Sequence, residues 1–463
     1  MDFLLARRLP ATGAAACYFW ARPFVEQIMN EQLVVKNFGP IKDATVDFKR
    51  VTVFIGPTGG GKSTLAKLAA IMKTKDSFKE GEQISMNLDS FKKYAINNFF
   101  SEATYFHYKN NRGNAKYENE KSDLWIELTQ ERADYANNIM DRFNIQLNQL
   151  KYIRSEIDAI NDILAKSPEK VNTTDFKERI AQLSAKQNEI ISTQEDLGKG
   201  TEYTSSWIPN ELASSICEYI PSERIFLSVL EYSWAGLLRD DIGLPKILLD
   251  FANNFSLARK EIHELEILFF NAKYLHINGR DFIKIPDREE PLMLSEAASS
   301  IQSVTPLLVL LEHLSRNTEQ AQSFIIEGPE LNLYPTAQRD LVYTLLEKCT
   351  QGKNDLTITT HSPYVLSALN LALYANKVAA MFPHQSKKVA KLIPEKYWLK
   401  AEEFSAYFVA KGGAKSIFDT KTGLLSESQL DELSGEFADV FDRLTDLRVP
   451  EKKAVAKAKP AKK

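Results

Sequence analysis

A glycine-rich run early in the chain has the residue types that bind nucleotide phosphates. The run is Gly56, Pro57, Thr58, Gly59, Gly60, Gly61, Lys62, Ser63 and Thr64. Its glycines let the backbone curl so that successive N–H groups point at phosphate oxygens. Lys62 can reach the β- and γ-phosphates, and the Ser63 hydroxyl can ligate Mg²⁺. The run therefore predicts binding of ATP with Mg²⁺, and a chance glycine-rich turn is the alternative.

Further polar residues follow two apolar runs in the second half of the chain. One run ends in Glu327, whose carboxylate is suited to holding Mg²⁺ directly or through water, and Glu330 lies three residues further on. The other run is followed by His361. A lone histidine is most often structural, but the carboxyl ends of parallel strands gather around a ligand. We therefore expect Glu327 and His361 to lie at the nucleotide.

The elements expected to position these residues are short strands and helices around each motif. The predicted strands are 33–36, 44–48, 51–55, 323–326 and 356–360, and the predicted helices are 64–72, 303–314 and 336–348. The run 51–55 is continuously apolar, which is typical of a buried parallel strand. Asn278-Gly279 predicts the turn of a hairpin over 274–285. This order of elements predicts an α/β fold.

The middle of the chain changes character. Apolar residues recur at steps of three and four over 139–164 and again over 176–190, with a polar turn between. This pattern predicts an antiparallel helical hairpin inserted into the α/β core. A helical subdomain packed on the core and a protruding coiled coil are equally consistent with the pattern.

Bulk composition narrows the class of protein. The chain has 463 residues, a formal net charge of −3 and 26% charged residues, so no global basic field points to nucleic acid. Its three cysteines, Cys17, Cys217 and Cys349, form no short-spaced pair, which fits a reducing compartment. No apolar stretch of about 18 residues predicts a spanning helix. We therefore expect a cytoplasmic protein without a membrane partner.

The chain resembles the ABC-type ATPases of the AAA class that are related to the SMC and OLD proteins. The matching stretches are 33–68, 219–224, 291–314, 323–335 and 357–369. The resemblance implies an α/β P-loop NTPase fold of ABC/SMC type, with a mixed-sheet core and an inserted helical hairpin. It also implies catalytic roles for Lys62, Glu327 and His361, with Ser63 and Glu327 holding Mg²⁺. Glu330 is a further catalytic candidate because it lies three residues after Glu327, although that is not the family's usual position.

The resemblance further implies that two chains sandwich two nucleotides head to tail, as a dimer or within a higher homo-oligomer. Each phosphate loop would face a signature segment of the other chain, for which the candidates are Ser299, Ser300 and Gln302. Family signatures carry Ser-Gly there, so Ser300 stands where glycine is usual. As a plain start of a helix, either serine would also be unremarkable.

A second departure from the family concerns hydrolysis. Members usually have two adjacent acidic residues at the end of the Mg²⁺ strand, and the second positions the attacking water. Here Glu327 is the first, but Gly328 occupies the second position. We predict slow hydrolysis, with ATP acting more as a clamp than as a fuel.

The patterns divide the chain into six predicted parts. These are an N-terminal extension (1–28), the first ATPase lobe with the phosphate loop (29–122), the helical hairpin (123–200), a helical region with a β-hairpin returning to the core (201–290), the second ATPase lobe with the signature, Glu327 and His361 (291–447), and a lysine-rich disordered tail (448–463).

Three biological roles compete. The first is the regulatory ATPase of a bacterial anti-phage defence system, resembling those of Septu, PARIS and retron systems, which sense a phage protein or DNA and control a separate effector. The second is an SMC-like DNA repair or chromosome-maintenance ATPase, and the third an ABC transporter subunit. Asp419, Asp431, Asp439 and Asp442 are spread along a predicted helix, which is unlike a metal-nuclease cluster. We therefore place any nuclease in a partner chain and favour the defence role.

Overall fold

The structure is a computed structural model, and it describes residues 31–74, 77–79, 85–110, 113–118, 124–128, 130–166, 173–198, 216–229, 244–316 and 321–426. The predicted N-terminal extension, the lysine-rich tail and three of the four C-terminal aspartates, Asp431, Asp439 and Asp442, lie outside these residues. Asp419 is described, and the prediction that it lies on a helix is wrong: it ends a short strand, β18 (Phe418–Asp419).

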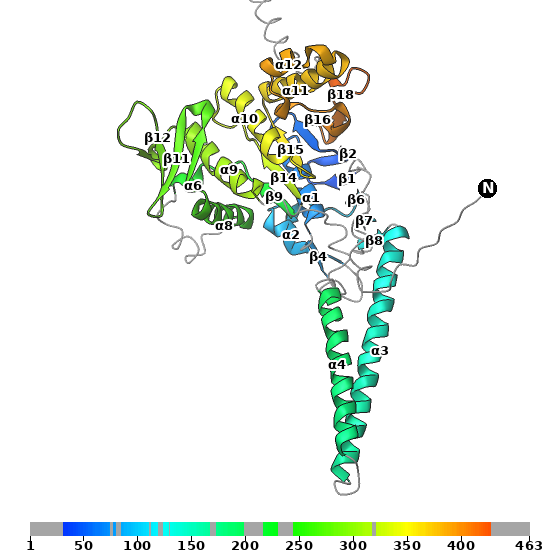
Figure 1. Cartoon of the computed structure of the whole chain (residues 1–463). Helices are drawn as coiled ribbons and strands as arrows, with labels where there is room; N and C mark the ends of the chain where they lie inside the picture. Colours follow the sequence, from blue (N-terminus) through cyan, green and yellow to red (C-terminus); the bar gives the residue numbers. More distant parts are fainter. Residues whose placement is uncertain are drawn as a thin grey trace, which may run out of the picture.

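A mixed sheet forms the centre of the molecule (Figure 1). Its strands are β1 (Glu31–Phe38), β2 (Ile41–Phe48), β3 (Val51–Ile55), β6 (Tyr105–Lys109), β7 (Gly113–Glu118), β8 (Leu124–Leu128), β9 (Ile216–Ile220), β14 (Gln322–Glu327), β15 (Asp355–Thr360), β16 (Phe404–Ala410) and β17 (Gly413–Ser416). They lie in the order β8-β7-β6-β1-β2-β17-β16-β3-β15-β14-β9. The strands from β16 to β9 run parallel, and β2, β1, β6, β7 and β8 pair antiparallel. The predicted α/β fold with a mixed sheet is confirmed.

The two faces of the parallel strands are covered by different helices. On one face, α1 (Lys62–Lys73) packs in a core that includes Phe54 and Ile325. On the other face, a second core includes Val53 and Phe324. Its helices are α8 (Lys246–Glu261), α9 (Ser299–Ser315), α10 (Pro335–Cys349) and α11 (Pro363–Met381). Because side chains alternate along a strand, neighbouring residues of β3 and β14 serve both cores.

Smaller elements surround this centre. They are β4 (Phe78–Lys79), β5 (Ser85–Met86), α2 (Leu88–Lys93), α6 (Phe226–Val229), β10 (Glu264–Ile267), β11 (Ala272–Ile277), β12 (Arg280–Lys284), β13 (Leu292–Met293), α12 (Ser386–Leu392) and β19 (Leu424–Leu425). Asn278 and Gly279, with φ of 50° and 78°, form the turn between β11 and β12. Positive φ at both positions is what this kind of two-residue hairpin turn requires, so the predicted hairpin is confirmed.

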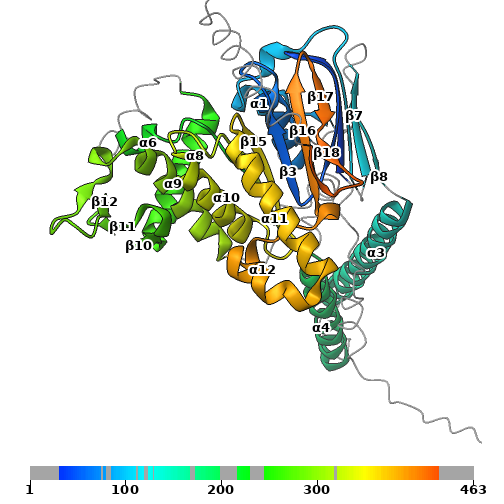
Figure 2. The same ribbon diagram turned by 90° about the horizontal axis from the view of Figure 1, so that it is seen from above.

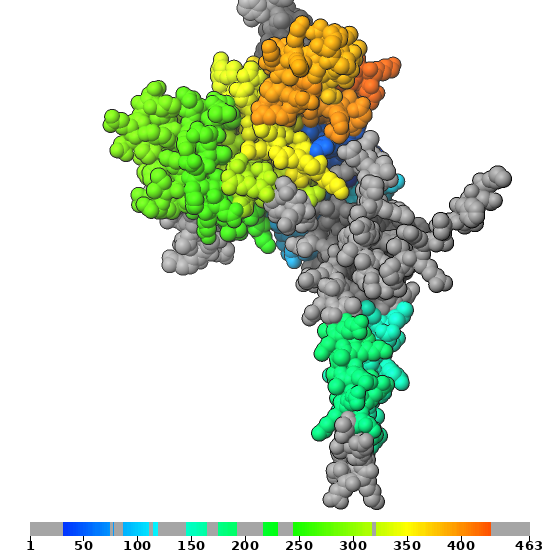
Figure 3. Space-filling model, viewed as in Figure 1, coloured from blue at the N-terminus to red at the C-terminus, as the bar shows by residue number. Residues whose placement is uncertain are grey.

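The predicted helical hairpin consists of α3 (Gln130–Lys166) and α4 (Thr173–Gly198). Figures 1 and 3 show the two helices side by side, projecting away from the sheet rather than packing on it. Their seam is formed by apolar residues at steps of three, four and seven: Leu150, Ile153, Ile157 and Ile160 on α3 with Phe176, Ile180, Leu183 and Ile190 on α4. This spacing keeps one apolar stripe of each helix on the other.

A buried ion cluster holds the far end of α1 to the sheet. The Lys73 ammonium lies 2.8 Å from Glu31 of β1 and 2.8 Å from Asp355 of β15, and it donates to the Ser323 hydroxyl of β14. All four side chains are buried. A buried charge is tolerated only when it is paired in this way. The cluster therefore fixes α1, and with it the loop at its other end, against three strands.

Among the described helices, none is by itself long and apolar enough to cross a bilayer. Only α11 taken together with Pro383–Leu392, across a bend of 119°, passes a test of length and composition.

Candidate functional site

The glycine-rich loop joins β3 to α1, as predicted from the sequence. Gly61, at φ 103°, precedes the first turn of α1, and no acidic side chain occupies that turn. A β-carbon added at Gly56 or Gly60 would lie 2.3 or 2.4 Å from the carbonyl oxygen of Val409 at the end of β16. Only glycine permits this close approach. The N–H groups at the start of α1 and the helix dipole suit an anion here.

Lys62 reaches back over the loop. Its ammonium donates to the carbonyls of Gly56 and Pro57, each at 2.9 Å, and lies 3.4 Å from Nδ1 of His361. Burial lowers the pKa of Lys62, and the charges of Glu330 and Glu327 oppose that shift. The loop lysine and the predicted histidine are therefore brought together, although 299 residues separate them in the chain.

Glu327 ends β14, beside the end of β15, with which it pairs in parallel. It is buried, and its Oε1 has no hydrogen-bond partner among the described residues. A buried carboxylate oxygen without a partner fits a metal ligand. Ser63, in the first turn of α1, is an exposed residue. These two residues fit the predicted Mg²⁺ site.

Glu330 connects the turn after β14 to the end of β15. Its Oε1 accepts the Thr360 hydroxyl at 2.7 Å and the backbone N–H of His361 at 2.9 Å. Its Oε2 is buried without a partner among the described residues. Burial and then the Lys62 charge lower the pKa of His361, against the opposing effect of Glu330. The lowered pKa favours the neutral form of the imidazole, which lies beside Lys62.

Gly328, which follows Glu327, has a left-handed backbone with φ of 45°. Its N–H donates to the Thr359 carbonyl at 2.9 Å, and an added β-carbon would lie 3.1 Å from the Leu331 side chain. L-residues with a side chain rarely adopt this conformation. A glutamate in the family's usual position would therefore require a different backbone here.

Arg224 is a site residue to which the sequence assigned no role. Its guanidinium is fully buried and donates to four backbone carbonyls: Pro221 at 2.7 Å, Glu327 at 2.7 Å, Gly328 at 2.8 Å and Ser303 at 3.3 Å. Burial lowers its pKa to about 10. The guanidinium thus ties the end of β14 to the first turns of α9. The only signal in the sequence was that 219–224 belongs to the matching stretches.

The three signature candidates begin α9, which packs against α6, α8 and α10. Residues of α9 belong to the core on one face of the sheet and residues of α1 to the core on the other, and Figures 1 and 2 show the two helices as separate elements. Ser299 is exposed and Ser300 half-buried. The Gln302 amide donates to the carbonyls of Ser295 and Ala297 and accepts the Ser228 hydroxyl. Gln302 is therefore engaged within its own chain.

Comparison with known families decides what kind of site this is. The family model described as AAA ATPase domain matches residues 29–366. The chain belongs to this family. The match spans the loop, Glu327, Glu330 and His361, and it confirms the prediction of an AAA-class ATPase.

Solved structures similar to this AAA ATPase are distant in sequence. The Smc head domain of Pyrococcus furiosus, with an extended coiled coil and bound to the C-terminal domain of ScpA, is 9% identical, with 89% of this chain and 100% of that chain covered and a TM-score of 0.32. The SMC head domain of Thermotoga maritima is 13% identical, with 84% and 98% covered and a TM-score of 0.35. The recombination mediator protein RecF with ATPγS is 12% identical, with 84% and 98% covered and a TM-score of 0.30. No curated protein matches the chain.

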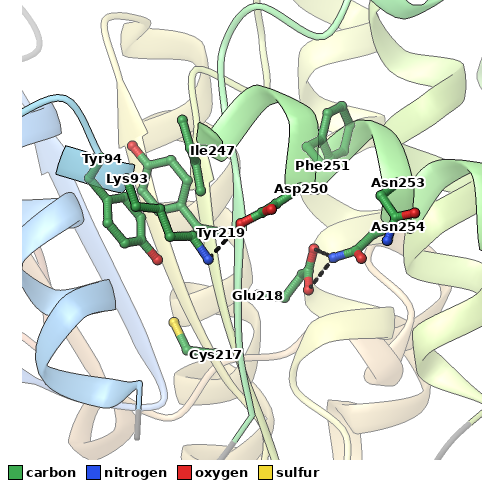
Figure 4. A pocket seen from close by; sticks show the side chains of 10 residues that line it. All are labelled: Lys93, Tyr94, Cys217, Glu218, Tyr219, Ile247, Asp250, Phe251, Asn253 and Asn254. Atoms are coloured by element: carbon green, nitrogen blue, oxygen red, sulfur yellow. Dashed lines mark hydrogen bonds and ion pairs between the residues drawn. The ribbon is translucent and has the colours of Figure 1, made fainter. Parts of the chain in front are cut away.

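A polar cavity of about 240 Å³ lies beyond the edge strand of the AAA ATPase sheet, between β9, α2 and α8 (Figure 4). Glu218 of β9 accepts both of its hydrogen bonds from the Asn254 amide, at 2.9 and 3.1 Å, and Lys93 pairs with Asp250 at 2.7 Å. Burial raises the pKa of Glu218 to about 7. No residue that the sequence predicted for the nucleotide lines this cavity.

Proposed function

We propose that this AAA ATPase is the regulatory subunit of a bacterial anti-phage defence system, acting in the cytoplasm. It binds ATP with Mg²⁺, forms a nucleotide-sandwich dimer or a higher homo-oligomer, and controls a separate effector, a nuclease. A phage protein or DNA is the trigger. The observation that carries the proposal is the hairpin of α3 and α4, which projects from an ATPase core and offers a surface for a partner.

In this proposal each site residue has a distinct role. Lys62 and the N–H groups of the loop bind the β- and γ-phosphates, because the ammonium charge and the N–H dipoles both favour an anion over the loop at the start of α1. Ser63 and Glu327 hold Mg²⁺, which when bound neutralises phosphate charge. His361, neutral and 3.4 Å from Lys62, is placed to accept or donate a hydrogen bond near the γ-phosphate.

Hydrolysis by this site is proposed to be slow. Gly328 provides no carboxylate, and its positive φ disfavours one. Glu330 is engaged with Thr360 and His361 rather than aimed at a water by any described contact. ATP would then hold a closed dimer until a trigger changes the balance between closed and open states.

The dimer is proposed to complete the site from the second chain. Ser299 lies exposed at the start of a 17-residue helix, where N–H groups lack partners. Such a helix start can bind a γ-phosphate presented by another chain. Arg224 links Ser303 of this helix to Glu327. Nucleotide binding at the end of β14 would therefore be coupled, within each chain, to the position of the signature helix α9.

The experiment that tests the role pairs the chain with the product of the neighbouring reading frame. Cells carrying both genes are challenged with a panel of phages, and the two proteins are co-purified with and without ATP. The proposal expects protection that requires both genes and disappears with Lys62→Ala. A neighbour that encodes a membrane permease, or protection unaffected by Lys62→Ala, would show the proposal to be wrong.

The SMC-like DNA maintenance role remains a second candidate, because the seam of the hairpin has the heptad spacing used by coiled-coil arms. DNA separates the two roles. Strong stimulation of ATP turnover by duplex DNA, together with sensitivity of the deletion strain to DNA damage and no phage phenotype, would favour this second role.

A further inference from the structure

The outward face of α11 carries an apolar stripe. Its positions follow steps of three and four residues, and five of the six are apolar: Tyr364, Ser367, Leu371, Tyr374, Val378 and Met381. Tyr374 is 53% exposed and Met381 61%, and Val378 is half-buried. The opposite face of the helix is buried in the core. A helix with one face in the core usually has a polar outer face, so this second stripe calls for a cover.

The sequence after the last described residue has the same spacing. Between 427 and 447, six of the seven large apolar residues fall at Leu430, Leu433, Phe437, Val440, Leu444 and Leu447, and the seventh is Phe441. The steps are three, four, three, four and three, identical to those of the α11 stripe. Two helices whose apolar residues repeat in this way pack along each other over their whole length. Each stripe spans about 26 Å at 1.5 Å per residue.

The described chain ends against α11. The Lys377 ammonium of α11 donates to the Thr422 carbonyl at 2.6 Å, and Asn370 of the same helix accepts the backbone N–H of Leu425 at 2.9 Å. The segment 430–447 therefore starts only a few residues from the middle of α11. The four residues from Ser426 to Leu430 span at most about 14 Å. Tyr364 lies about 9 Å along the helix from Asn370, so the start of the stripe is within reach.

Charge also favours this pairing. The segment 427–447 carries seven acidic residues and one basic residue, Arg443. Next to the far end of α11, α12 presents three exposed lysines, Lys387, Lys388 and Lys391. Figures 2 and 3 show α11 and α12 together at the surface of the molecule. The segment is therefore acidic and apolar, and the α11 stripe has positive charge near its far end, so the two are complementary in charge.

We propose that residues 430–447 form a helix that packs on the α11 stripe of the same chain, running parallel to α11. Leu430 then lies next to Tyr364, Val440 next to Tyr374 and Leu447 next to Met381. Since α11 begins two residues after His361, the C-terminal helix covers the element that leads directly from the nucleotide site. This inference does not depend on the defence role.

Disulfide formation in the full-length chain tests the pairing. The variant Tyr374→Cys/Val440→Cys is oxidised, and linked peptides are identified by mass spectrometry on the monomeric and dimeric fractions. In the control Tyr374→Cys/Asp442→Cys the second position lies on the opposite side of the same predicted helix. We expect an intramolecular 374–440 link with a yield about fivefold or more above the control. Equal yields, or a link found only in the dimeric fraction, overturn the proposal, and the second result assigns the stripe to another copy.

Hydrogen exchange of the full-length protein gives an independent readout. The proposal expects amides of 430–447 to be protected, and protection to fall about tenfold or more in Leu371→Glu/Met381→Glu. Both positions are exposed in the structure, so the fold is expected to survive. Tyr152→Glu, which changes an exposed aromatic residue on α3, is the matched control. Unprotected exchange of 430–447 in the unaltered chain would overturn the proposal.

Discussion

The Glu330 carboxylate accepts the backbone N–H of His361 at 2.9 Å, and so ties the turn after β14 to the end of β15. The same oxygen accepts the Thr360 hydroxyl at 2.7 Å. These two bonds fix the backbone from which the imidazole extends toward Lys62. Glu330 is therefore a positioning residue in this structure, whatever the rate of hydrolysis.

Glutamine and alanine at position 330 separate charge from hydrogen bonding. Glu330→Gln keeps an acceptor oxygen, so ATP affinity should stay within about threefold. Glu330→Ala leaves the buried Thr360 hydroxyl and the part-buried His361 N–H without their acceptor, and should lower the free energy of unfolding by about 2 kcal/mol. Urea denaturation and titration with a fluorescent ATP analogue measure both, with Glu402→Ala as an exposed control. Brisk turnover that disappears in Glu330→Gln would instead make Glu330 the catalytic base.

Lys62→Met should weaken ATP binding at least about tenfold, because the contact of an ammonium with phosphate is a charge-assisted hydrogen bond. Stabilisation of the fold by ATP should then be lost, since it follows from binding. Lys67→Met changes a half-buried lysine of the same helix and serves as the control. Thermal unfolding with and without ATP and Mg²⁺ gives the answer. Equal stabilisation of the two variants would remove Lys62 from the site.

The sequence predicted what is local in this site and missed what is distant. The loop, the apolar strand before Glu327 and the Asn278-Gly279 turn each depend on neighbouring residues, and all were placed correctly. Val409 could not be found, because β16 pairs with β3 only after the chain has returned through the whole second lobe. The sequence also gave an incomplete account of Gly328. The sequence shows a missing carboxylate, but only the backbone shows a positive φ.

Arg224 shows the same limit and makes a sharp prediction. Arg224→Met leaves four buried carbonyls without their donor, and should lower the free energy of unfolding by about 3 kcal/mol. Arg224→Lys keeps the charge but loses the planar fork, so it should recover only part of this loss. Arg339→Met is the control, because that exposed arginine pairs at the surface with its neighbour Asp340, and its loss should change stability by less than about 0.5 kcal/mol. A small effect of Arg224→Met in urea denaturation would refute the linking role.

Alanine at Gly328 should destabilise the fold by about 1–2 kcal/mol, since φ of 45° is costly for an L-residue. Gly413→Ala is the matched control, because Gly413 has no positive φ and an added β-carbon meets only the Asp43 carbonyl at 3.5 Å. For the same reason, Gly328→Glu should fail to raise ATP turnover. A Gly328→Glu variant that is stable and hydrolyses ATP faster would show that the backbone adapts easily.

Glu218 should make stability depend on pH, because burial raises its folded-state pKa from 4.5 to about 7. The folded chain then binds this proton more tightly than the unfolded chain. The contribution is fully present below about pH 4.5 and is lost as pH rises through about 7. From pH 5 to pH 8 the unaltered chain should therefore lose about 2 kcal/mol relative to Glu218→Gln, which cannot titrate.

Urea denaturation of both chains across this pH range measures the difference. The Lys93–Asp250 ion pair, which also lines the cavity, is present in both chains and cancels in the comparison. Glu402→Gln, at an exposed carboxylate, should run parallel to the unaltered chain. If the free energy of unfolding of Glu218→Gln also changes with pH in parallel with that of the unaltered chain, the prediction is wrong. The carboxylate would then be ionised in the folded protein at pH 5, and solvent or Lys93 would stabilise its charge more than burial opposes it.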